Sequence, residues 1–468
     1  MRKLSRRRFL ATAASAAALG PAAVKGRGAD DAPQLPTPSA GQLAWQDCEV
    51  GLLYCFDLPV AASVFAANNA VRQRLDPNRY DPAKLDTDAW LEVARAAGAG
   101  YAVFTATHFS GFMQWQSDLY PYGLKQTRWR DGKGDVVADF VESCRKAGIE
   151  PGIYFSTHRN AWQTVWGHYV DWGRGKGTER QEVYNRIAEK QTGELCSRYG
   201  ELLEIWYDAG VKTPEEGGPD VLPIFEKLQP DGVFYHSKQR SDHRWIGNEA
   251  GHAGVPCWAT MPRIDGEVSH NAATWKKHLH GGMEDGPYWS PGMVDVPLRG
   301  AGGIHHWFWK PNAERGVFTP EQLVDMYYQS VGRNANYIIG VVIKPDGSVP
   351  EPDAASLAAF GREIRRRFGK PLAQTQGEGQ LIELKLPAPQ KIDHLVVMEE
   401  IARGERVRAY ELEGLVAGND WRKLAEGACI GHKRIHQIDP TEVAAVRLKV
   451  TRSVASPLIR NLAVYHAG

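Results

Sequence analysis

Short apolar runs alternate with helical segments from about residue 45 to residue 368, and this alternation restricts the fold more than any other feature of the sequence. The run at 101–105 is continuously apolar, as expected of a buried parallel strand. Residues 87–98 have a helical pattern, with Asp86 or Thr87 as N-cap and Gly98 as stop signal. The same patterns predict helices at 136–147, 181–199 and 219–228, and strands at 149–155, 202–207, 233–236, 257–261, 305–309 and 337–343. Repeated strand–helix units predict an α/β fold, either a barrel of the (β/α)8 type or a doubly wound sheet.

Polar side chains stand directly after the predicted strands. The positions are Thr107 with His108, Thr157 with His158, Asp208, and His236 with Ser237. In a TIM-type barrel the carboxyl ends of the strands build the active site. This order therefore favours the barrel, and we assign it to residues 45–370.

The pattern changes after Pro371. Short β-type runs between turn signals follow one another at 380–386, 392–398, 407–414, 433–438, 443–451 and 458–465. Such a series predicts an all-β sandwich, which we assign to residues 371–468.

The N-terminus has the pattern of an export signal. Ser5-Arg6-Arg7-Arg8-Phe9-Leu10 precedes an Ala-rich stretch, and the whole resembles a twin-arginine signal over residues 1–28, followed by a Pro-rich leader at 29–44. A basic tail without targeting function is the alternative. A membrane anchor is disfavoured, because a spanning helix needs about 20 strongly apolar residues. We expect export to the periplasm or the medium.

Charge and cysteine usage exclude several classes of function. Residues 1–28 hold seven basic residues and no acidic one, so the formal net charge of +1 becomes −6 without them. A mildly acidic chain without a basic stripe is a poor nucleic-acid binder. The six cysteines are scattered, with no CxxC pair, and HExxH is absent. We therefore predict no metal and no other cofactor, and mostly buried thiols, with one disulfide left open.

Asp208 is the strongest candidate for a catalytic residue. It follows the strand predicted at 202–207, within the segment Glu204-Ile-Trp-Tyr-Asp208-Ala-Gly210. A carboxylate at a strand end, in a partly desolvated cleft, can attack the anomeric carbon of a sugar. The alternative is an Asp that caps the next loop, and the motif alone does not separate the two.

A retaining glycosidase needs a second carboxyl group, about 5–5.5 Å from the first, that protonates the leaving oxygen. Glu249 lies 41 residues after Asp208, in a Gly-containing loop. Its alternative role is an ion pair with Arg244. Glu284 is the second choice for the acid.

Four further side chains are candidates for sugar contacts. The imidazole of His108 can bond a sugar hydroxyl, and the rings of Trp115, Trp206 and Trp245 can stack on a sugar face. Core packing is the alternative role for each.

Several segments resemble the α-L-fucosidase family of retaining glycoside hydrolases. Thr105-Ala-Thr-His108-Phe-Ser-Gly-Phe112 is similar to the family's Thr-Ala-Lys-His-His-Asp-Gly-Phe, and Trp206-Tyr-Asp208 to its Trp-Phe-Asp nucleophile strand. Arg244-Trp-Ile-Gly-Asn-Glu249 resembles the acid/base segment of the branch that often prefers α-1,3/1,4-linked fucose. The segments Gly132-Lys-Gly-Asp-Val-Val137, Gly152-Ile-Tyr-Phe-Ser156 and Ser330-Val-Gly-Arg-Asn334 also match.

The resemblance implies an exo-acting hydrolase without a metal. It implies a glycan substrate, a catalytic barrel and a C-terminal sandwich of galactose-binding type. Asp208 would be the nucleophile and Glu249 the acid/base of a double displacement.

The sequence departs from the family at three places. Cys55 replaces a sugar-contacting His, Phe109 replaces the second His of the pair and is followed by Ser110, and Met293 replaces a Glu. We count Cys55, Phe109 and Arg244 with the substrate-binding positions. A lost hydrogen bond in a sugar site changes its specificity. We therefore expect the sugar to be L-fucose or a relative such as L-galactose, and the substrate to include sulfated or branched glycans.

Two other classes of function stay open. The departures are compatible with a glycan-binding protein on an enzyme scaffold, which would bind without hydrolysis. Metal-dependent hydrolysis could draw on 15 histidines, but none shows a ligand spacing. The sequence makes no prediction of the oligomeric state.

Overall fold

The structure is a computed structural model that describes residues 35–65, 73–268, 273–418 and 420–468. The expected export signal lies outside the described residues, as does most of the expected leader. Helix α1 (Ala40–Cys48) already begins within the range assigned to the leader, with Ser39 as its N-cap.

Eight strands of the described chain form one parallel sheet, in the order β7-β6-β3-β2-β1-β12-β11-β8. They are β1 (Val50–Cys55), β2 (Tyr101–Thr107), β3 (Glu150–Phe155), β6 (Glu204–Tyr207), β7 (Val233–Tyr235), β8 (Arg244–Trp245), β11 (Gly292–Pro297) and β12 (Ala335–Val342). Adjacent strands pair in parallel, from β1 with β2 to β11 with β8. The predicted TIM-type barrel is confirmed, as a nearly closed one.

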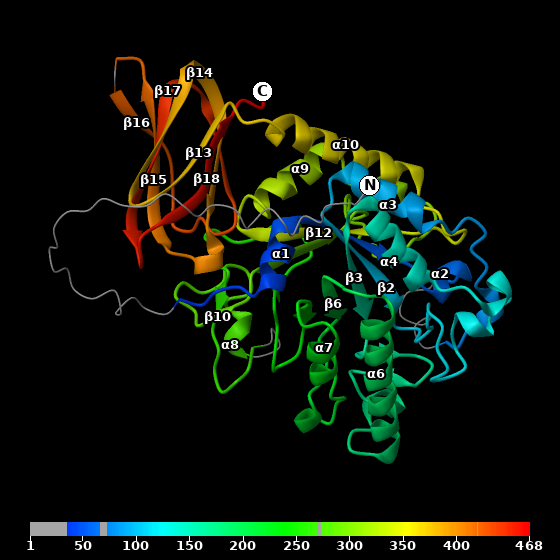
Figure 1. Cartoon of the computed structure of the whole chain (residues 1–468). Coiled ribbons are helices and arrows are strands. Elements are labelled where there is room, and N and C mark those ends of the chain that lie inside the picture. Colours follow the sequence, from blue (N-terminus) through cyan, green and yellow to red (C-terminus); the bar gives the residue numbers. More distant parts are fainter. Residues whose placement is uncertain (1–34, 66–72, 269–272, 419) are drawn as a thin grey trace, which may run out of the picture. The chain divides into compact units, whose positions relative to one another are not determined.

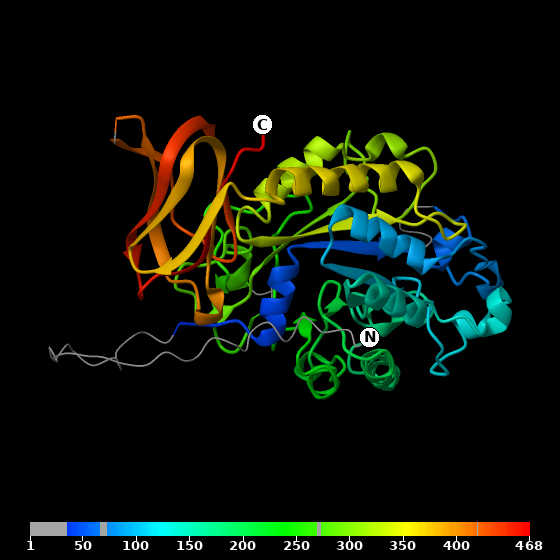
Figure 2. The ribbon, with the colours of Figure 1, turned by 45° about the horizontal axis from the view of Figure 1, so that its top comes forward.

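Helices cover the outside of this sheet (Figures 1 and 2). The longer ones are α3 (Thr87–Ala97), α4 (Val136–Ala147), α6 (Glu179–Arg198), α7 (Leu222–Leu228), α9 (Pro320–Gln329) and α10 (Glu351–Phe368). The predicted caps are present in α3, where Asp86 accepts from Ala89 and Gly98 ends the helix at φ 79°. Only glycine adopts this left-handed conformation without steric cost.

Short elements complete the barrel domain. They are α2 (Leu58–Ala61), α5 (Val170–Gly173), α8 (Ala273–Lys276), the single 3-10 turns at Pro77–Arg79, Leu124–Gln126, Trp129–Gly132, Pro214–Glu216 and Glu314–Gly316, and the two-residue strands β4 (Arg159–Asn160), β5 (Val165–Trp166), β9 (Thr260–Met261) and β10 (Tyr288–Trp289).

Two of the predicted barrel strands are wrong. Within 257–261 only β9 forms, and it pairs antiparallel with β10 outside the barrel. Residues 305–309 form a loop. The barrel instead uses β8, which has two residues, and β11, where Asp295 and Pro297 interrupt the apolar pattern. Neither shows the continuous apolar run by which a buried strand is recognised.

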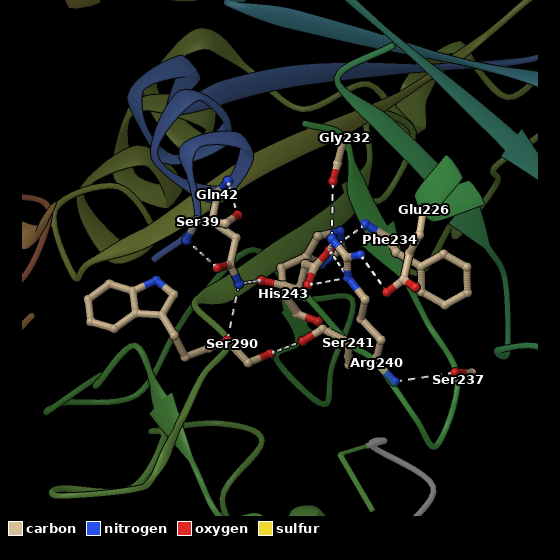
Figure 3. Close-up of polar contacts among 12 residues, drawn as sticks. Ser39, Gln42, Glu226, Gly232, Phe234, Ser237, Arg240, Ser241, His243 and Ser290 are labelled. Atoms are coloured by element: carbon tan, nitrogen blue, oxygen red, sulfur yellow. Dashed lines mark hydrogen bonds and ion pairs between the residues drawn. The ribbon is translucent and has the colours of Figure 1, made fainter. Parts of the chain in front are cut away.

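Side chains bridge the barrel between β7 and β8, which do not pair in the described part of the chain (Figure 3). Asp242 accepts the main-chain N–H of Phe234 in β7 at 2.7 Å, and the Arg240 guanidinium bonds both carboxylate oxygens of Asp242. Gln42 of α1 donates its amide to the carbonyls of Asp242 and Trp289. This network ties β7 and helix α1 to Asp242, in the segment that leads into β8.

Below the carboxyl ends, the barrel interior is filled. The His243 ring stacks between Trp45, at 4.6 Å, and Tyr235, at 4.3 Å. Its Nε2 lies 2.7 Å from Glu204 Oε1, and both side chains are fully buried. Barrels of this type place their ligand sites at the carboxyl ends of the strands, above this packed layer.

The C-terminal part is an antiparallel sheet of six strands in the described residues, in the order β13-β18-β14-β17-β15-β16. The strands are β13 (Ala373–Glu378), β14 (Leu381–Glu399), β15 (Val407–Val416), β16 (Asp420–Gly427), β17 (Arg434–Ser453) and β18 (Leu458–Tyr465), with a 3-10 turn at Ile401–Arg403. The register of β14 with β17 breaks between Lys385 and Gln390. Four of the predicted runs thus merge into two long interrupted strands around a separate apolar core.

Candidate active site

Asp208 stands at the carboxyl end of β6. Ala209 and Gly210 follow with φ of 57° and 78°, so the chain turns sharply away after the carboxylate. The Tyr154 hydroxyl donates to Asp208 Oδ2 at 2.8 Å. Burial raises the pKa of Asp208, while the Tyr154 hydroxyl, the Ala209 N–H and the Arg159 charge act in the opposite direction. The result is a desolvated carboxylate that three groups help to keep ionised.

Glu249 follows β8, on a loop that turns at Gly247 with φ of 92°. Its Oε2 accepts the indole N–H of Trp307 at 2.9 Å and a hydrogen bond with His305 Nε2. The side chain is 37% exposed. Its charge is close enough to Asp208 to raise the pKa of that carboxyl. The two predicted catalytic carboxyl groups therefore belong to one site.

The segment 299–310, which we call the aromatic loop, brings the partners of Glu249 into place. It begins at Arg299, which is fully buried and bonds both carboxylate oxygens of Asp353 at 3.0 and 2.9 Å. The Trp307 ring packs against Gly340 of β12, where a Cβ would lie 2.5 Å from two ring atoms. Phe308 contacts the His108 ring with a centroid distance of 4.5 Å. This loop thus touches both Glu249 and the end of β2.

The floor of the site holds a third carboxyl group, Asp295 of β11. Trp245 donates its indole N–H to Asp295 Oδ1 at 2.9 Å. Burial and the Glu249 charge raise the pKa of Asp295 well above its usual range. Cys55 is also buried there, with its thiol directed to the Leu53 carbonyl, and burial and the Asp208 charge raise its pKa.

One wall of the site is a stack of planar groups. The Arg159 guanidinium lies over the rings of Phe109, at 4.8 Å, and Trp166, at 4.1 Å. Phe109 stacks on His108 at 3.9 Å, and His108 on Tyr154 at 5.5 Å. Burial and the Arg159 charge lower the pKa of His108 to about 3, so its imidazole is neutral.

Three predicted site residues lie elsewhere. Trp115 is fully buried and donates to Glu194 of helix α6. Arg244 is fully buried and donates to the carbonyls of Leu279 and Ser290. Glu284 pairs with Arg452 of the C-terminal sheet at 2.8 Å. A fourth predicted residue, Trp206, is only 5% exposed, and its ring lies between those of Tyr154 and Tyr235.

Sequence reasoning missed several residues of the site. They are Tyr154, Arg159, Asp295, His305 and Trp307. A carboxylate inside the run Met-Val-Asp-Val and the five aromatic residues at 305–309 are the signals that could have drawn attention to Asp295 and to the aromatic loop.

The described residues contain no group of three or more His, Cys, Asp or Glu side chains that could hold a metal ion. All six cysteines are described, and none of them forms a disulfide. No helix in the same ranges is long and apolar enough to cross a membrane.

Known proteins resemble this chain over most of its length. The family model described as alpha-L-fucosidase matches residues 72–367. Alpha-L-fucosidase 1 of Arabidopsis thaliana is 28% identical over 92% of this chain and 88% of its own. A putative alpha-L-fucosidase structure from Bacteroides thetaiotaomicron VPI-5482 is 42% identical, with a TM-score of 0.88, and covers 92% of this chain and 99% of its own. A glycoside hydrolase 29 family member from an unknown rumen bacterium is 29% identical, with a TM-score of 0.77, and the match covers 93% and 78% of the two chains.

Proposed function

Because this chain belongs to the alpha-L-fucosidase family of glycoside hydrolases, we propose that it removes terminal α-L-fucose, or a related α-L-sugar such as L-galactose, from glycans. The reaction is a double displacement with retention of the anomeric configuration. One observation carries the proposal: Asp208 is buried at the end of β6 with a hydroxyl donor, within electrostatic range of the half-exposed Glu249.

In the first step, an oxygen of Asp208 attacks the anomeric carbon. Glu249 gives its proton to the glycosidic oxygen, and the bond between that oxygen and the anomeric carbon breaks, with the electron pair staying on the oxygen. The Tyr154 hydroxyl orients the nucleophile through Oδ2. The product is a glycosyl ester of Asp208.

In the second step, the Glu249 carboxylate takes a proton from water, and the water oxygen attacks the anomeric carbon. Asp208 leaves as a carboxylate, and Glu249 is protonated again. Both steps use the same two carboxyl groups, and no metal is required.

The identity of the sugar depends on the wall and floor of the site. Cys55 directs its thiol to a main-chain carbonyl, and the Phe109 ring packs under a guanidinium, so neither offers the imidazole donor of the family pattern. His108 and Asp295 are two polar groups near Asp208 that can bond sugar hydroxyls.

A panel of aryl glycosides tests this function. The purified chain is assayed on the α-L-fucoside, α-L-galactoside, β-D-galactoside and α-D-galactoside, with Asp208→Ala beside it. We expect hydrolysis of an α-L-glycoside that falls by about 10³-fold or more in the variant, since the nucleophile is lost. The anomer first released, read by proton NMR, should have the configuration of the substrate.

Other outcomes would contradict the proposal. Equal activity of Asp208→Ala would remove this residue from the mechanism. Glycan binding without hydrolysis, unchanged in Glu249→Ala, would support the glycan-binding alternative instead.

We also propose that the chain is exported, on the basis of Arg6-Arg7-Arg8-Phe9-Leu10 and the Ala-rich stretch that follows. Replacing these three arginines with lysine should retain the protein in the cytoplasm of a host with a twin-arginine system. Unchanged fractionation of the variant would contradict this.

A further inference from the structure

We infer that His305 positions the acid/base: together with Trp307 it occupies Oε2 of Glu249, so that the proton which Glu249 transfers is confined to Oε1. The inference rests on the proposed function, because it assumes that Glu249 is the acid/base.

The geometry at Oε2 leads to this conclusion. Trp307 Nε1 can only donate, and it does so to Oε2 at 2.9 Å. His305 Nε2 is hydrogen-bonded to the same oxygen. Because the indole N–H points at Oε2, a carboxyl proton on Oε2 cannot point toward Trp307. His305 occupies the other side of the same oxygen. With a hydrogen on Nε2, His305 is a second donor to Oε2, and the proton of protonated Glu249 then lies on Oε1.

The surroundings of His305 indicate a functional contact rather than a packing one. Its side chain is 49% exposed, so core packing does not require an imidazole there. The carboxyl groups that interact with Glu249 are those of Asp295 and Asp208. On the side of His305 the neighbouring titratable group is His306, whose own pKa is lowered by burial and by Lys310 and Arg299.

The arrangement serves both steps of the reaction. When Oε1 gives its proton to the leaving oxygen, Glu249 becomes a carboxylate. The N–H groups of His305 and Trp307 already point at Oε2 and stabilise that charge without reorganisation. When Oε1 takes the proton from water, the starting state returns, with no net change in His305.

Leaving-group dependence tests the inference. The kcat/KM is measured for aryl α-L-fucosides whose phenols range from strongly to weakly acidic, since only poor leaving groups need a well-placed acid. We expect His305→Phe to lose about 10-fold or more on the weakly acidic phenols and less than about 3-fold on the most acidic one. His305→Gln, which keeps an N–H donor, should recover most of this loss.

Two further variants make the test specific. His306→Gln, which changes the neighbouring histidine, should leave the whole series unchanged. Glu249→Gln should show a still steeper dependence on the leaving group, as the loss of the acid itself requires.

Different outcomes overturn different parts. If Glu249→Gln behaves as expected but His305→Phe loses nothing, or loses the same factor with every phenol, the inference about His305 is wrong and the proposed function stands. If Glu249→Gln shows no dependence on the leaving group, the assignment of the acid fails, and the inference fails with it.

Discussion

At the scale of single residues, the site holds two buried carboxyl groups, Asp208 and Asp295, in different surroundings. Burial raises the pKa of both Asp208 and Asp295, but only Asp208 has a hydroxyl, a main-chain N–H and a nearby guanidinium to stabilise its charge. Asp295 has the Trp245 indole and its own main-chain N–H as donors but faces two other carboxyl groups, so it holds its proton to higher pH. A protonated Asp295 can donate to a sugar hydroxyl while Asp208 serves as the proposed nucleophile.

Tyr154→Phe should move the acidic limb of the kcat/KM profile to higher pH. The nucleophile must be ionised, its pKa is already raised by burial, and removal of the Tyr154 hydroxyl takes away a group that lowers it. Activity is lost as pH falls through the pKa of Asp208, so the loss begins at a higher pH in the variant. At the acidic end we expect kcat/KM to fall by about 10-fold, as for a lost bond to a charged group.

The matched control is Tyr207→Phe, whose hydroxyl bonds Thr192 instead of the site. It should cost stability but leave the pH profile in place. A profile of Tyr154→Phe that coincides with the unmodified enzyme would show that the hydroxyl does not act on the nucleophile.

At the scale of elements, the site depends on how the aromatic loop packs on strand β12. Gly340 leaves room for the Trp307 ring, and Trp307 in turn donates to Glu249. A glycine in the middle of a buried strand weakens the strand itself. Here it allows the close approach of a large ring, which places the partner of the acid/base.

Gly340→Ala should therefore damage catalysis through Trp307. The new Cβ would stand 2.5 Å from the ring atoms Cε3 and Cζ3, so the indole must shift and its hydrogen bond to Glu249 is lost. We expect the free energy of unfolding to fall by about 1–3 kcal/mol, as in other overpacked cores. The kcat/KM on poor leaving groups should fall by about 10-fold or more.

Gly193→Ala in helix α6 is the control, because its nearest neighbour is the Ile224 side chain at 4.0 Å. Alanine favours helix over glycine by about 1 kcal/mol, so this variant should be as stable or more stable, with unchanged activity. Unchanged activity of Gly340→Ala would mean that the Trp307 ring can shift without losing its hydrogen bond to Glu249.

At the scale of the whole molecule, the barrel and the C-terminal sheet share a buried polar junction. Asn334, just before β12, donates to the Cys257 carbonyl at 2.9 Å and to Glu405 Oε1 at 2.6 Å, and accepts the main-chain N–H of His432 at 2.7 Å. Glu405 also accepts the N–H of Ala259. Residues 35–468 form one compact unit, and this junction is part of the reason.

Asn334→Ala should lower the free energy of unfolding by about 3 kcal/mol, because it leaves buried partners without hydrogen bonds. Asn334 has φ of 64°, a left-handed conformation that costs alanine about 1–2 kcal/mol. Asn334→Gly, which loses the same bonds without that strain, should be less destabilised. Urea denaturation of both variants measures the difference, and equal losses would show that backbone conformation does not contribute.

Much of this protein could be predicted from local sequence. The Asp86 and Gly98 caps set the ends of α3, and the apolar run at 101–105 lies within β2, because caps and periodicity act over a few residues. The order of these units indicated a barrel, and the strand pattern before Asp208 indicated that this carboxylate stands at a strand end. The family resemblance also followed from short segments of contiguous residues.

The tertiary structure alone decided the rest. The short strand β8 is held by its neighbour β11, and the gap beside β7 is bridged by Gln42, some 200 residues away in the chain. Arg244 is buried although it adjoins Trp245, which reaches the site. The contacts of Glu249 with the aromatic loop, and of Asp295 with Trp245, join side chains that are 50 or more residues apart. Periodicity and capping are local, whereas burial and hydrogen-bond partners are set by which distant segments pack together. The sequence therefore determined most elements and the place of Asp208 at a strand end, and packing determined how Glu249 is held.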